Sequence, residues 1–369
     1  MRCRYGSPRR VQSGLLVGYS RACDPTPRLA FSNTKLVASP GMARPRLVLI
    51  IGSPRSGTTW LQSVLGSHPA IATPQETDIF SMFLAPLSQA WDGQRDNLAK
   101  TDNRRRKGLS TVLAESEFAA GCRGIVEQMI DAVHRQKPTA EVVIEKSPSH
   151  SMCTDVIQRF WPQATFIHVI RDGRDVAASL VAASQSFGVN FAPAEVHRAA
   201  RMWSHRLRGA RMAADAPGGY LEIRYEDLHS NGVATARQAF EACGVSVSDA
   251  EIAAILEKNE FGAVAKGVVS PSILTPSSSA EADRLRTEPE GFFRKGQVGG
   301  WRDEWSSDDR FAFDDVAGDL LIELGYEPDA SWLGTNRRPK PARPPLMLTA
   351  SRKLRNLAAH MEQRSQTSK

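Results

Sequence analysis

A short glycine-containing loop between an apolar run and a helical pattern constrains this chain more than any other feature. Residues 47–51 are continuously apolar, as in a strand covered on both faces, and run straight into Gly52-Ser-Pro-Arg-Ser-Gly-Thr-Thr-Trp60. A helical pattern follows at residues 58–65. A strand, loop and helix in this order point backbone N–H groups and the positive helix end at a bound phosphate. The sequence therefore predicts an anion site in this loop.

Further apolar runs and helical patterns alternate along the chain after this loop. Short apolar segments typical of strands occur at residues 142–144, 166–170 and 221–225. Helical patterns occupy residues 175–183, 194–214 and 233–243. Strands that alternate with helices favour an α/β class, in which helices flank a central parallel sheet. We therefore predict one α/β domain over residues 46–330.

The basic residues are concentrated at the two ends of the chain. The formal net charge is +7 over 369 residues, yet residues 1–45 carry +7 and residues 336–369 carry +8, which leaves −8 on the segment between them. An acidic core of this kind does not favour a basic groove for nucleic acid. The sequence therefore predicts no nucleic-acid partner.

Neither end of the chain shows the periodicity of a regular helix or strand. Residues 1–45 are rich in Arg, Ser and Pro and are predicted to form a disordered basic extension, and residues 331–369 a basic, Pro/Arg-rich tail. Three origins of the extension stay open: translation assigned upstream of a true start at Met42, a plain disordered tail, or a transit segment. The first two predict a cytoplasmic protein and the third an organelle-targeted one.

The cysteines and the length of the apolar runs bear on the redox compartment and on whether the chain crosses a membrane. Five cysteines are scattered without a Cys-x-x-Cys pair, which is typical of a reduced compartment and predicts no structural zinc. The longest apolar run, residues 47–51, is far shorter than the roughly 20 residues that span a bilayer. We therefore expect a folded protein with no transmembrane segment and no metal.

The glycine spacing of the loop resembles a Walker A motif with one decisive change. Gly52 and Gly57 have the G-x4-G spacing, but Thr58 stands where a phosphate-binding lysine should follow the second glycine. A P-loop kinase or NTPase uses that lysine together with Mg²⁺. The change argues against ATP cleavage. A P-loop kinase or NTPase, or a non-catalytic nucleotide-binding protein of the same fold, stays open as an alternative.

The octet from Ser53, Ser-Pro-Arg-Ser-Gly-Thr-Thr-Trp, resembles the 5′-phosphosulfate loop of sulfotransferases that depend on 3′-phosphoadenylyl sulfate (PAPS). The resemblance implies a P-loop-NTPase-like sulfotransferase fold with PAPS as co-substrate. It implies that Arg55 is the loop cation, beside the bridging oxygen of the transferred group, and that Trp60 stacks on adenine. It assigns the 5′-phosphate to the loop residues Ser56, Gly57, Thr58 and Thr59.

Two further motifs follow in the order found in that family. Arg171-Asp-Gly-Arg-Asp-Val-Ala-Ala-Ser179 begins where a predicted strand ends, which is where ligands bind in open α/β sheets. It resembles the family's 3′-phosphate motif, with Arg171 and Ser179 as the contacts. The run Arg294-Lys295-Gly296 is similar to the C-terminal Arg-Lys-Gly segment of the family, which implies a second clasp on that phosphate.

Other residues near these motifs have more general interpretations. Tyr225 falls where the family places a tyrosine beside the adenine. Arg174 and Asp175 fit an ion pair at the start of a helix. The three histidines that lie near the motifs are expected to be structural: His68, His150 and His168.

Sulfuryl transfer needs a group that removes the proton of the acceptor. The chain lacks the Lys-Thr-His motif that supplies a histidine in the cytosolic branch of the family, so we expect a carboxylate. Glu76 follows His68-Pro69 and resembles the base of tyrosylprotein sulfotransferases, whereas Glu145, in Glu-Lys-Ser, resembles the base of the heparan sulfate branch. Both stay open, as does a plain strand-end ion pair between Glu145 and Lys146.

Lys146 is common to both comparisons, which imply that it stabilises charge on the leaving group. Together the motifs predict transfer of a sulfuryl group from PAPS to a hydroxyl or amine, with release of adenosine 3′,5′-bisphosphate. The acceptor stays open among carbohydrate, lipid, peptide tyrosine and small hydroxylated molecules. Variable loops are expected to build its pocket, here residues 80–110, 185–193 and 268–291.

Overall fold

The computed structural model describes residues 44–100, 108–188, 192–259, 273–274 and 296–334. Several expectations concern positions outside these ranges. They are the disordered extension up to residue 43, the two cations Arg294 and Lys295, and the basic tail from residue 335 onward. Most of the expected acceptor loop at residues 268–291 also lies outside the described residues.

The predicted central parallel sheet is confirmed. Six strands pair in parallel in the order β5-β4-β1-β3-β2-β6. Four had been predicted as apolar segments, whereas β2 and β6, with four and two residues, are too short for a sequence pattern. The strands are β1 Arg46–Gly52, β2 Ile71–Pro74, β3 Val142–Lys146, β4 Thr165–Ile170, β5 Tyr220–Arg224 and β6 Ile273–Leu274.

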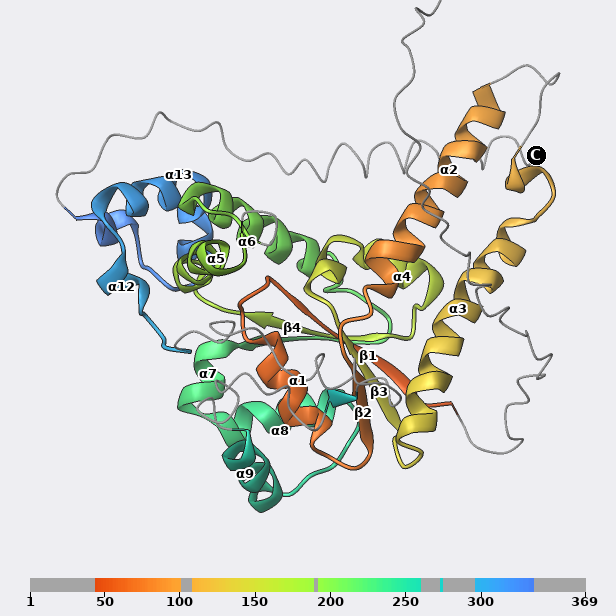
Figure 1. Ribbon diagram of the computed structural model, residues 1–369, viewed down its shortest axis with the longest axis horizontal. Coiled ribbons are helices and arrows are strands. Elements are labelled where there is room, and N and C mark those ends of the chain that lie inside the picture. Colours follow the sequence, from red (N-terminus) through yellow and green to blue (C-terminus); the bar gives the residue numbers. More distant parts are fainter. Residues whose placement is uncertain (1–43, 101–107, 189–191, 260–272, 275–295, 335–369) are drawn as a thin grey trace, which may run out of the picture. The chain divides into compact units, whose positions relative to one another are not determined.

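Helices connect the strands and cover both faces of the sheet. The longer ones are α1 Thr58–Gly66, α2 Ala85–Lys100, α3 Glu115–Gln136, α5 Gly173–Phe187, α6 Val196–Arg211, α8 Gly232–Ala242, α9 Asp249–Lys258 and α13 Ser307–Glu323. Shorter turns are η1 Ile79–Leu84, η3 Leu109–Thr111, η4 Pro148–Met152, α4 Thr154–Phe160, α7 Tyr225–Ser230, α12 Trp301–Glu304 and η5 Ala330–Leu333. Helices α1, α8 and α9 lie on one side of the strands, and α3, α4 and α6 on the other (Figure 1).

The structure differs in two places from the elements predicted from the sequence. Residues 80–110 had been expected to form a variable loop, but most of this segment is helical, in η1 and α2. Phe80, Leu84 and Trp91 are buried there, because their spacing brings them onto one helical face. Tyr225, expected at the end of a strand, begins α7 instead.

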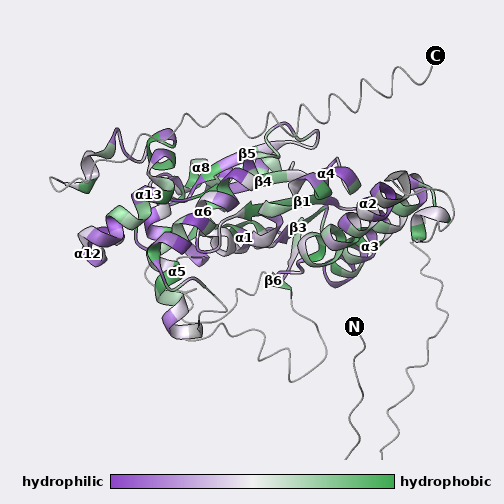
Figure 2. Ribbon diagram, turned by 90° about the horizontal axis from the view of Figure 1, so that it is seen from above, coloured by the Kyte–Doolittle hydropathy of each residue, from purple (hydrophilic) through white to green (hydrophobic). Residues whose placement is uncertain are grey.

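The core follows from the alternation of side chains along the strands. In β1, Leu47, Leu49 and Ile51 pack with α3 and α4, while Val48 and Ile50 pack with α1 and α8. Figure 2 shows the hydrophobic colouring of β1 between more hydrophilic helices. No described helix is long and apolar enough to cross a membrane.

The topology brings the predicted motifs to one edge of the sheet. The chain leaves β1 for β2 and β3 on one side and then crosses to β4 and β5 on the other. Strand β1 therefore lies at a topological switch point, where open α/β sheets bind ligands beyond the carboxyl ends of their strands. The segments after β1, β3 and β4 carry Arg55, Lys146 and Arg171 at this edge.

Candidate active site

The loop between β1 and α1 is tightly folded. Gly57 has a φ of 92°, and a Cβ at this position would overlap the ring of Tyr225. Arg55 has a φ of 72°, a backbone conformation that costs a non-glycine residue about 1–3 kcal/mol and is common at functional sites. Thr58 and Thr59 then open α1, whose first amide groups face the loop. The loop and helix start thus have the strand, loop and helix geometry on which the prediction of an anion site rests.

Side chains from β4, α5 and α7 close over this loop. Arg171 donates through Nη1 to the carbonyl oxygen of Arg55 at 3.1 Å, and its guanidinium lies 4.3 Å from the centroid of the Tyr225 ring. Arg55 donates through Nε to Ser179 Oγ at 3.0 Å. The loop cation therefore contacts a residue predicted for the 3′-phosphate, because the two motifs, 124 residues apart in sequence, meet at the same sheet edge.

Several buried donors in this region have no partner within the described part of the chain. They are the Arg171 Nε group and the hydroxyls of Ser53 and Ser56. A buried unpaired donor costs about 1–3 kcal/mol, and phosphate oxygens are acceptors that can satisfy such groups. The Tyr225 hydroxyl donates to the Gly296 carbonyl oxygen at 2.9 Å, which brings the predicted third motif to the same place.

An aromatic cluster lies beside the loop. The Trp60 ring is 5.8 Å from Tyr225, edge to face, and 4.9 Å from His229. Trp60 Nε1 donates to the carbonyl oxygen of Asn259 at 2.9 Å, which fixes the indole. Burial and then the charge of Arg171 lower the pKa of His229, so the ring is neutral at pH 7. His229 had not been predicted, although it lies four residues after Tyr225 and therefore on the same helical face.

Lys146 and Glu76 form an ion pair at the end of β3. Lys146 Nζ contacts Glu76 Oε1 and donates to Thr59 Oγ1 at 3.1 Å. The Lys146 side chain is 4% exposed, whereas that of Glu76 is 47% exposed. The lysine is therefore held against the start of α1, and the carboxylate beside it stays accessible to a second molecule.

Comparison with known proteins decides the family. A model described as "Sulfotransferase family" matches residues 45–249, more than half of the chain. The protein belongs to the sulfotransferase family. Nodulation protein NoeE of Sinorhizobium fredii is 27% identical over 302 residues, which cover 77% of this chain and 66% of that protein.

A second relative is protein-tyrosine sulfotransferase 1 of Homo sapiens, 27% identical over 135 residues that cover 37% of this chain and 34% of the human protein. The chain therefore spans less than two thirds of the length of either relative. Among solved structures, mouse sulfotransferase SULT7A1 complexed with PAP gives a TM-score of 0.47 at 15% identity, covering 80% of this chain and 90% of that one.

The second predicted carboxylate, Glu145, is completely buried. Its Oε1 accepts hydrogen bonds from the Thr77 amide at 3.1 Å, the Thr77 hydroxyl at 2.9 Å and the Ser147 hydroxyl at 2.6 Å. Its Oε2 lies 2.7 Å from His150 Nδ1. Burial raises the pKa of Glu145, but the contacts with His150, Ser147 and Thr77 outweigh it and hold the pKa below its ordinary value. Oε1 is therefore hydrogen-bonded inside the protein, and Oε2 faces the His150 ring.

The alternative of a strand-end ion pair between Glu145 and Lys146 is wrong. Successive side chains on a strand point to opposite faces, so Glu145 faces η4 while Lys146 faces α1. The ion pair expected at the start of α5 also has other partners. Arg174 pairs with Asp172 and Glu327, whereas Asp175 accepts the backbone N–H groups of Gly299 and Trp301.

The three histidines expected to be structural have partners within the fold. His68 Nδ1 accepts the Ala70 amide, and His150 pairs with Glu145. His168 lies 2.8 Å from the Tyr220 hydroxyl, and burial lowers its pKa. No group of three metal-ligating side chains occurs among the residues that the structure describes.

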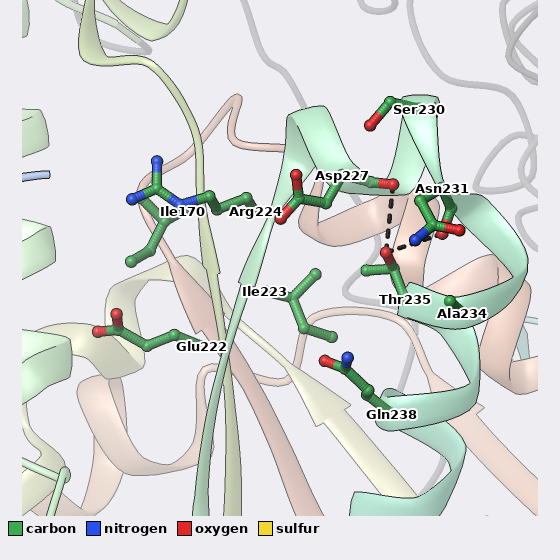
Figure 3. A pocket seen from close by; sticks show the side chains of 10 residues that line it. All are labelled: Ile170, Glu222, Ile223, Arg224, Asp227, Ser230, Asn231, Ala234, Thr235 and Gln238. Carbon is green, nitrogen blue, oxygen red and sulfur yellow. Dashed lines mark hydrogen bonds between the residues drawn. The ribbon is translucent and has the colours of Figure 1, made fainter. Parts of the chain in front are cut away.

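A separate cavity of about 480 Å³ lies between β5 and the helices α7 and α8 (Figure 3). Figure 3 shows Thr235 bonded to the carbonyl oxygens of Asp227 and Asn231 in its wall. Arg224 donates to the Leu324 carbonyl oxygen, so its charged end is already bound within the fold. None of the predicted site residues lines this cavity, and the candidate active site is the loop edge instead. The lining residues are Ile170, Glu222, Ile223, Arg224, Asp227, Ser230, Asn231, Ala234, Thr235 and Gln238.

Proposed function

We propose that this protein transfers a sulfuryl group from PAPS to a hydroxyl or amine of an acceptor and releases adenosine 3′,5′-bisphosphate. The observation that carries the proposal is the convergence of three motifs at one sheet edge, where Arg171 bonds to the loop at Arg55 and Lys146 pairs with Glu76 beside it. Membership of the sulfotransferase family supports the same reaction class.

The nucleotide is proposed to bind across the loop. Ser56, Gly57, Thr58 and Thr59 would hold the 5′-phosphate at the start of α1, where the helix dipole favours an anion. Arg171, Ser179 and Gly296 would hold the 3′-phosphate, together with Arg294 and Lys295 outside the described residues. Trp60 and Tyr225 would contact the adenine. The unpaired buried donors of Ser53, Ser56 and Arg171 support this placement.

Glu76 is the proposed base. It would accept the proton of the acceptor while the acceptor oxygen or nitrogen forms a bond to sulfur. The bond between sulfur and the bridging oxygen then breaks, and its electron pair stays on the 5′-phosphate. Lys146 and Arg55 would stabilise that negative charge by charge-assisted hydrogen bonds. The exposure of Glu76 supports this role, because a base must reach the acceptor, whereas Glu145 is fully enclosed.

The acceptor is proposed by class only, as a carbohydrate, lipid, peptide tyrosine or small hydroxylated molecule. Relatives named protein-tyrosine sulfotransferase make a tyrosine peptide one of the first acceptors to try. A carbohydrate, a lipid and a small phenol complete an informative panel. The segment of η1 and α2 follows Glu76 directly and is a candidate wall for this pocket.

The proposal is tested with the purified protein, labelled PAPS and the acceptor panel. The expected result is acceptor-dependent release of adenosine 3′,5′-bisphosphate and an acceptor that gains one sulfuryl group by mass spectrometry. Mg²⁺-dependent loss of ATP, with no protection by adenosine 3′,5′-bisphosphate in thermal melts, would favour a P-loop NTPase instead. Binding of the bisphosphate without transfer to native cell extract would favour a non-catalytic role.

A further inference from the structure

A buried network on the far side of β3 holds the segment that follows Glu76. The amide of Thr77 donates to Glu145 at 3.1 Å, the amide of Asp78 to Ser147 Oγ at 3.1 Å, and the amide of Phe80 to His150 Nε2 at 3.2 Å. The Thr77 and Asp78 amides directly precede the helical turn η1, and the Phe80 amide lies in its first turn, where backbone N–H groups have no partner within the helix. Side chains 68–70 residues further along the chain thus cap this turn.

His150 links the Glu145 carboxylate to the backbone of η1. Its Nε2 accepts the Phe80 amide, and its Nδ1 lies 2.7 Å from Glu145 Oε2. Both side chains are fully buried. The other carboxylate oxygen, Oε1, accepts three hydrogen bonds, from the amide and hydroxyl of Thr77 and from the Ser147 hydroxyl.

The segment before Glu76 is anchored from the opposite face of the sheet. Gln62 on α1 is buried and donates from Nε2 to the Thr73 hydroxyl and to the Pro74 carbonyl oxygen, both at 2.8 Å. The backbone is thus fixed at Pro74 and again at Thr77, with Glu76 between the two anchors. Because Lys146 directly follows Glu145, the same strand end places both members of the Glu76–Lys146 pair.

The backbone at Asp78 is strained, which indicates that the surrounding network holds this turn in place. Asp78 has a φ of 49°, in the left-handed region that non-glycine residues rarely adopt. Its side chain bonds to the hydroxyls of Ser81 and Ser149. Arg206 donates to the carbonyl oxygens of Pro148 and Ser149, which ties η4 to α6. A strained backbone persists only where its surroundings hold it in place.

We propose that Glu145 and His150 are positioning residues, which hold Glu76 opposite Lys146 from behind the sheet. The inference rests on the proposed role of Glu76 as the base. It assigns Glu145 no contact with the acceptor or with the nucleotide. Loss of the network would let the turn at residues 77–80 move, and a displacement of about 1 Å at a reacting group can slow turnover about 100-fold.

The test uses Glu145→Gln and His150→Phe in the full chain. Both should lower kcat about 10- to 100-fold while the KM for PAPS and the affinity for adenosine 3′,5′-bisphosphate stay unchanged. His150→Asn should recover part of kcat, because the Asn amide can place an N–H donor where Nδ1 lies, 2.7 Å from Glu145 Oε2. If Glu145 and His150 had only a general structural role, kcat would not fall while the KM for PAPS stays constant. His150→Asn would also not be more active than His150→Phe.

A control exists in a second histidine and glutamate pair, in which His168 is buried and Glu222 is partly exposed. His168 Nδ1 lies 3.4 Å from Glu222 on β4 and β5, away from η1. His168→Phe should lower the melting temperature but leave kcat unchanged. An equal loss of kcat in His168→Phe would overturn the positioning role, as would normal kcat in both Glu145→Gln and His150→Phe.

Hydrogen exchange separates the failure of this inference from the failure of the proposed function. Glu145→Gln should speed exchange of the amides of residues 77–80 relative to the rest of the sheet, whether or not PAPS is turned over. If exchange of these amides is unchanged in Glu145→Gln, the network does not hold residues 77–80 in place and the inference is wrong. If Glu145→Gln abolishes turnover while Glu76→Gln keeps it, Glu145 is itself the base, and both the positioning role and the proposed role of Glu76 are wrong.

Discussion

Glu145 and Lys146 are neighbours on β3, yet they belong to two different regions of the molecule. On the η4 side, Glu145 is enclosed with His150, Ser147 and Thr77, and its carboxylate contacts all three. On the α1 side, Lys146 faces Thr59 and the half-exposed Glu76. The enclosed side is suited to holding a shape, and the open side to meeting a substrate. The difference follows from strand alternation alone.

The largest effect is expected on the open side. Glu76→Gln removes the proposed base and should lower kcat about 10²- to 10⁴-fold, because general base catalysis typically contributes that much. Steady-state rates of bisphosphate release measure kcat, and calorimetry with adenosine 3′,5′-bisphosphate checks that binding is unchanged. Glu141→Gln, an exposed acid at the opposite end of β3, is the control and should behave as wild type. Near-normal turnover in Glu76→Gln would show that Glu76 is not the base, and the proposed difference in role between the two regions would be wrong.

The next effect concerns Lys146, the other member of the open side. Lys146→Met should lower kcat about 10²- to 10³-fold, since removal of one charge-stabilising donor from an active site typically costs that much. Lys146→Arg keeps the charge and should retain more activity than Lys146→Met. Single-turnover measurements isolate the chemical step. Equal rates in the Met and Arg variants would show that the charge is not used.

The nucleotide motifs could be predicted from the sequence because each lies within one short continuous segment. The strand, loop and helix at residues 46–66 form from one continuous segment, and a parallel sheet brings strand ends to the same edge. Arg171, Ser179 and Tyr225 were predicted as contacts of the nucleotide that the Arg55 loop binds. In the structure Arg55 contacts Ser179, and Arg171 contacts both the Arg55 carbonyl oxygen and the Tyr225 ring.

The choice between the two carboxylates could not be predicted in the same way. Burial of Glu145 depends on contacts with Thr77 across 68 residues, and no local pattern encodes them. The helix α2 was mistaken for a loop because its apolar positions are sparse and its burial is supplied by α3 and α4. Likewise, the contact between Arg55 and Ser179 depends on side-chain packing rather than on motif order.

A smaller effect is expected for Arg171, which is proposed to bind the nucleotide at the same sheet edge. Arg171→Ala should weaken binding of adenosine 3′,5′-bisphosphate about 10- to 100-fold, because a hydrogen bond to a charged group contributes about 1.5–3 kcal/mol. At saturating PAPS, kcat should change much less than in Glu76→Gln. Arg201→Ala, an exposed arginine on α6, is the control for loss of charge alone. An unchanged dissociation constant in Arg171→Ala would remove this residue from the phosphate site.

The smallest effect tests the enclosed side through pH. The folded state holds the pKa of Glu145 below the ordinary value of 4.5, so its contribution to stability is present above about pH 4.5 and is lost as the pH falls through the lowered value. A glutamine cannot ionise, so the Glu145→Gln variant should start with a lower melting temperature at pH 7 and lose less of it on acidification to pH 3.5. Thermal melts followed by circular dichroism measure both slopes. If the melting temperatures of wild type and Glu145→Gln fall in parallel with pH, Glu145 titrates in the folded protein as it does in the unfolded chain. Its enclosure by His150, Ser147 and Thr77 would then not stabilise the carboxylate.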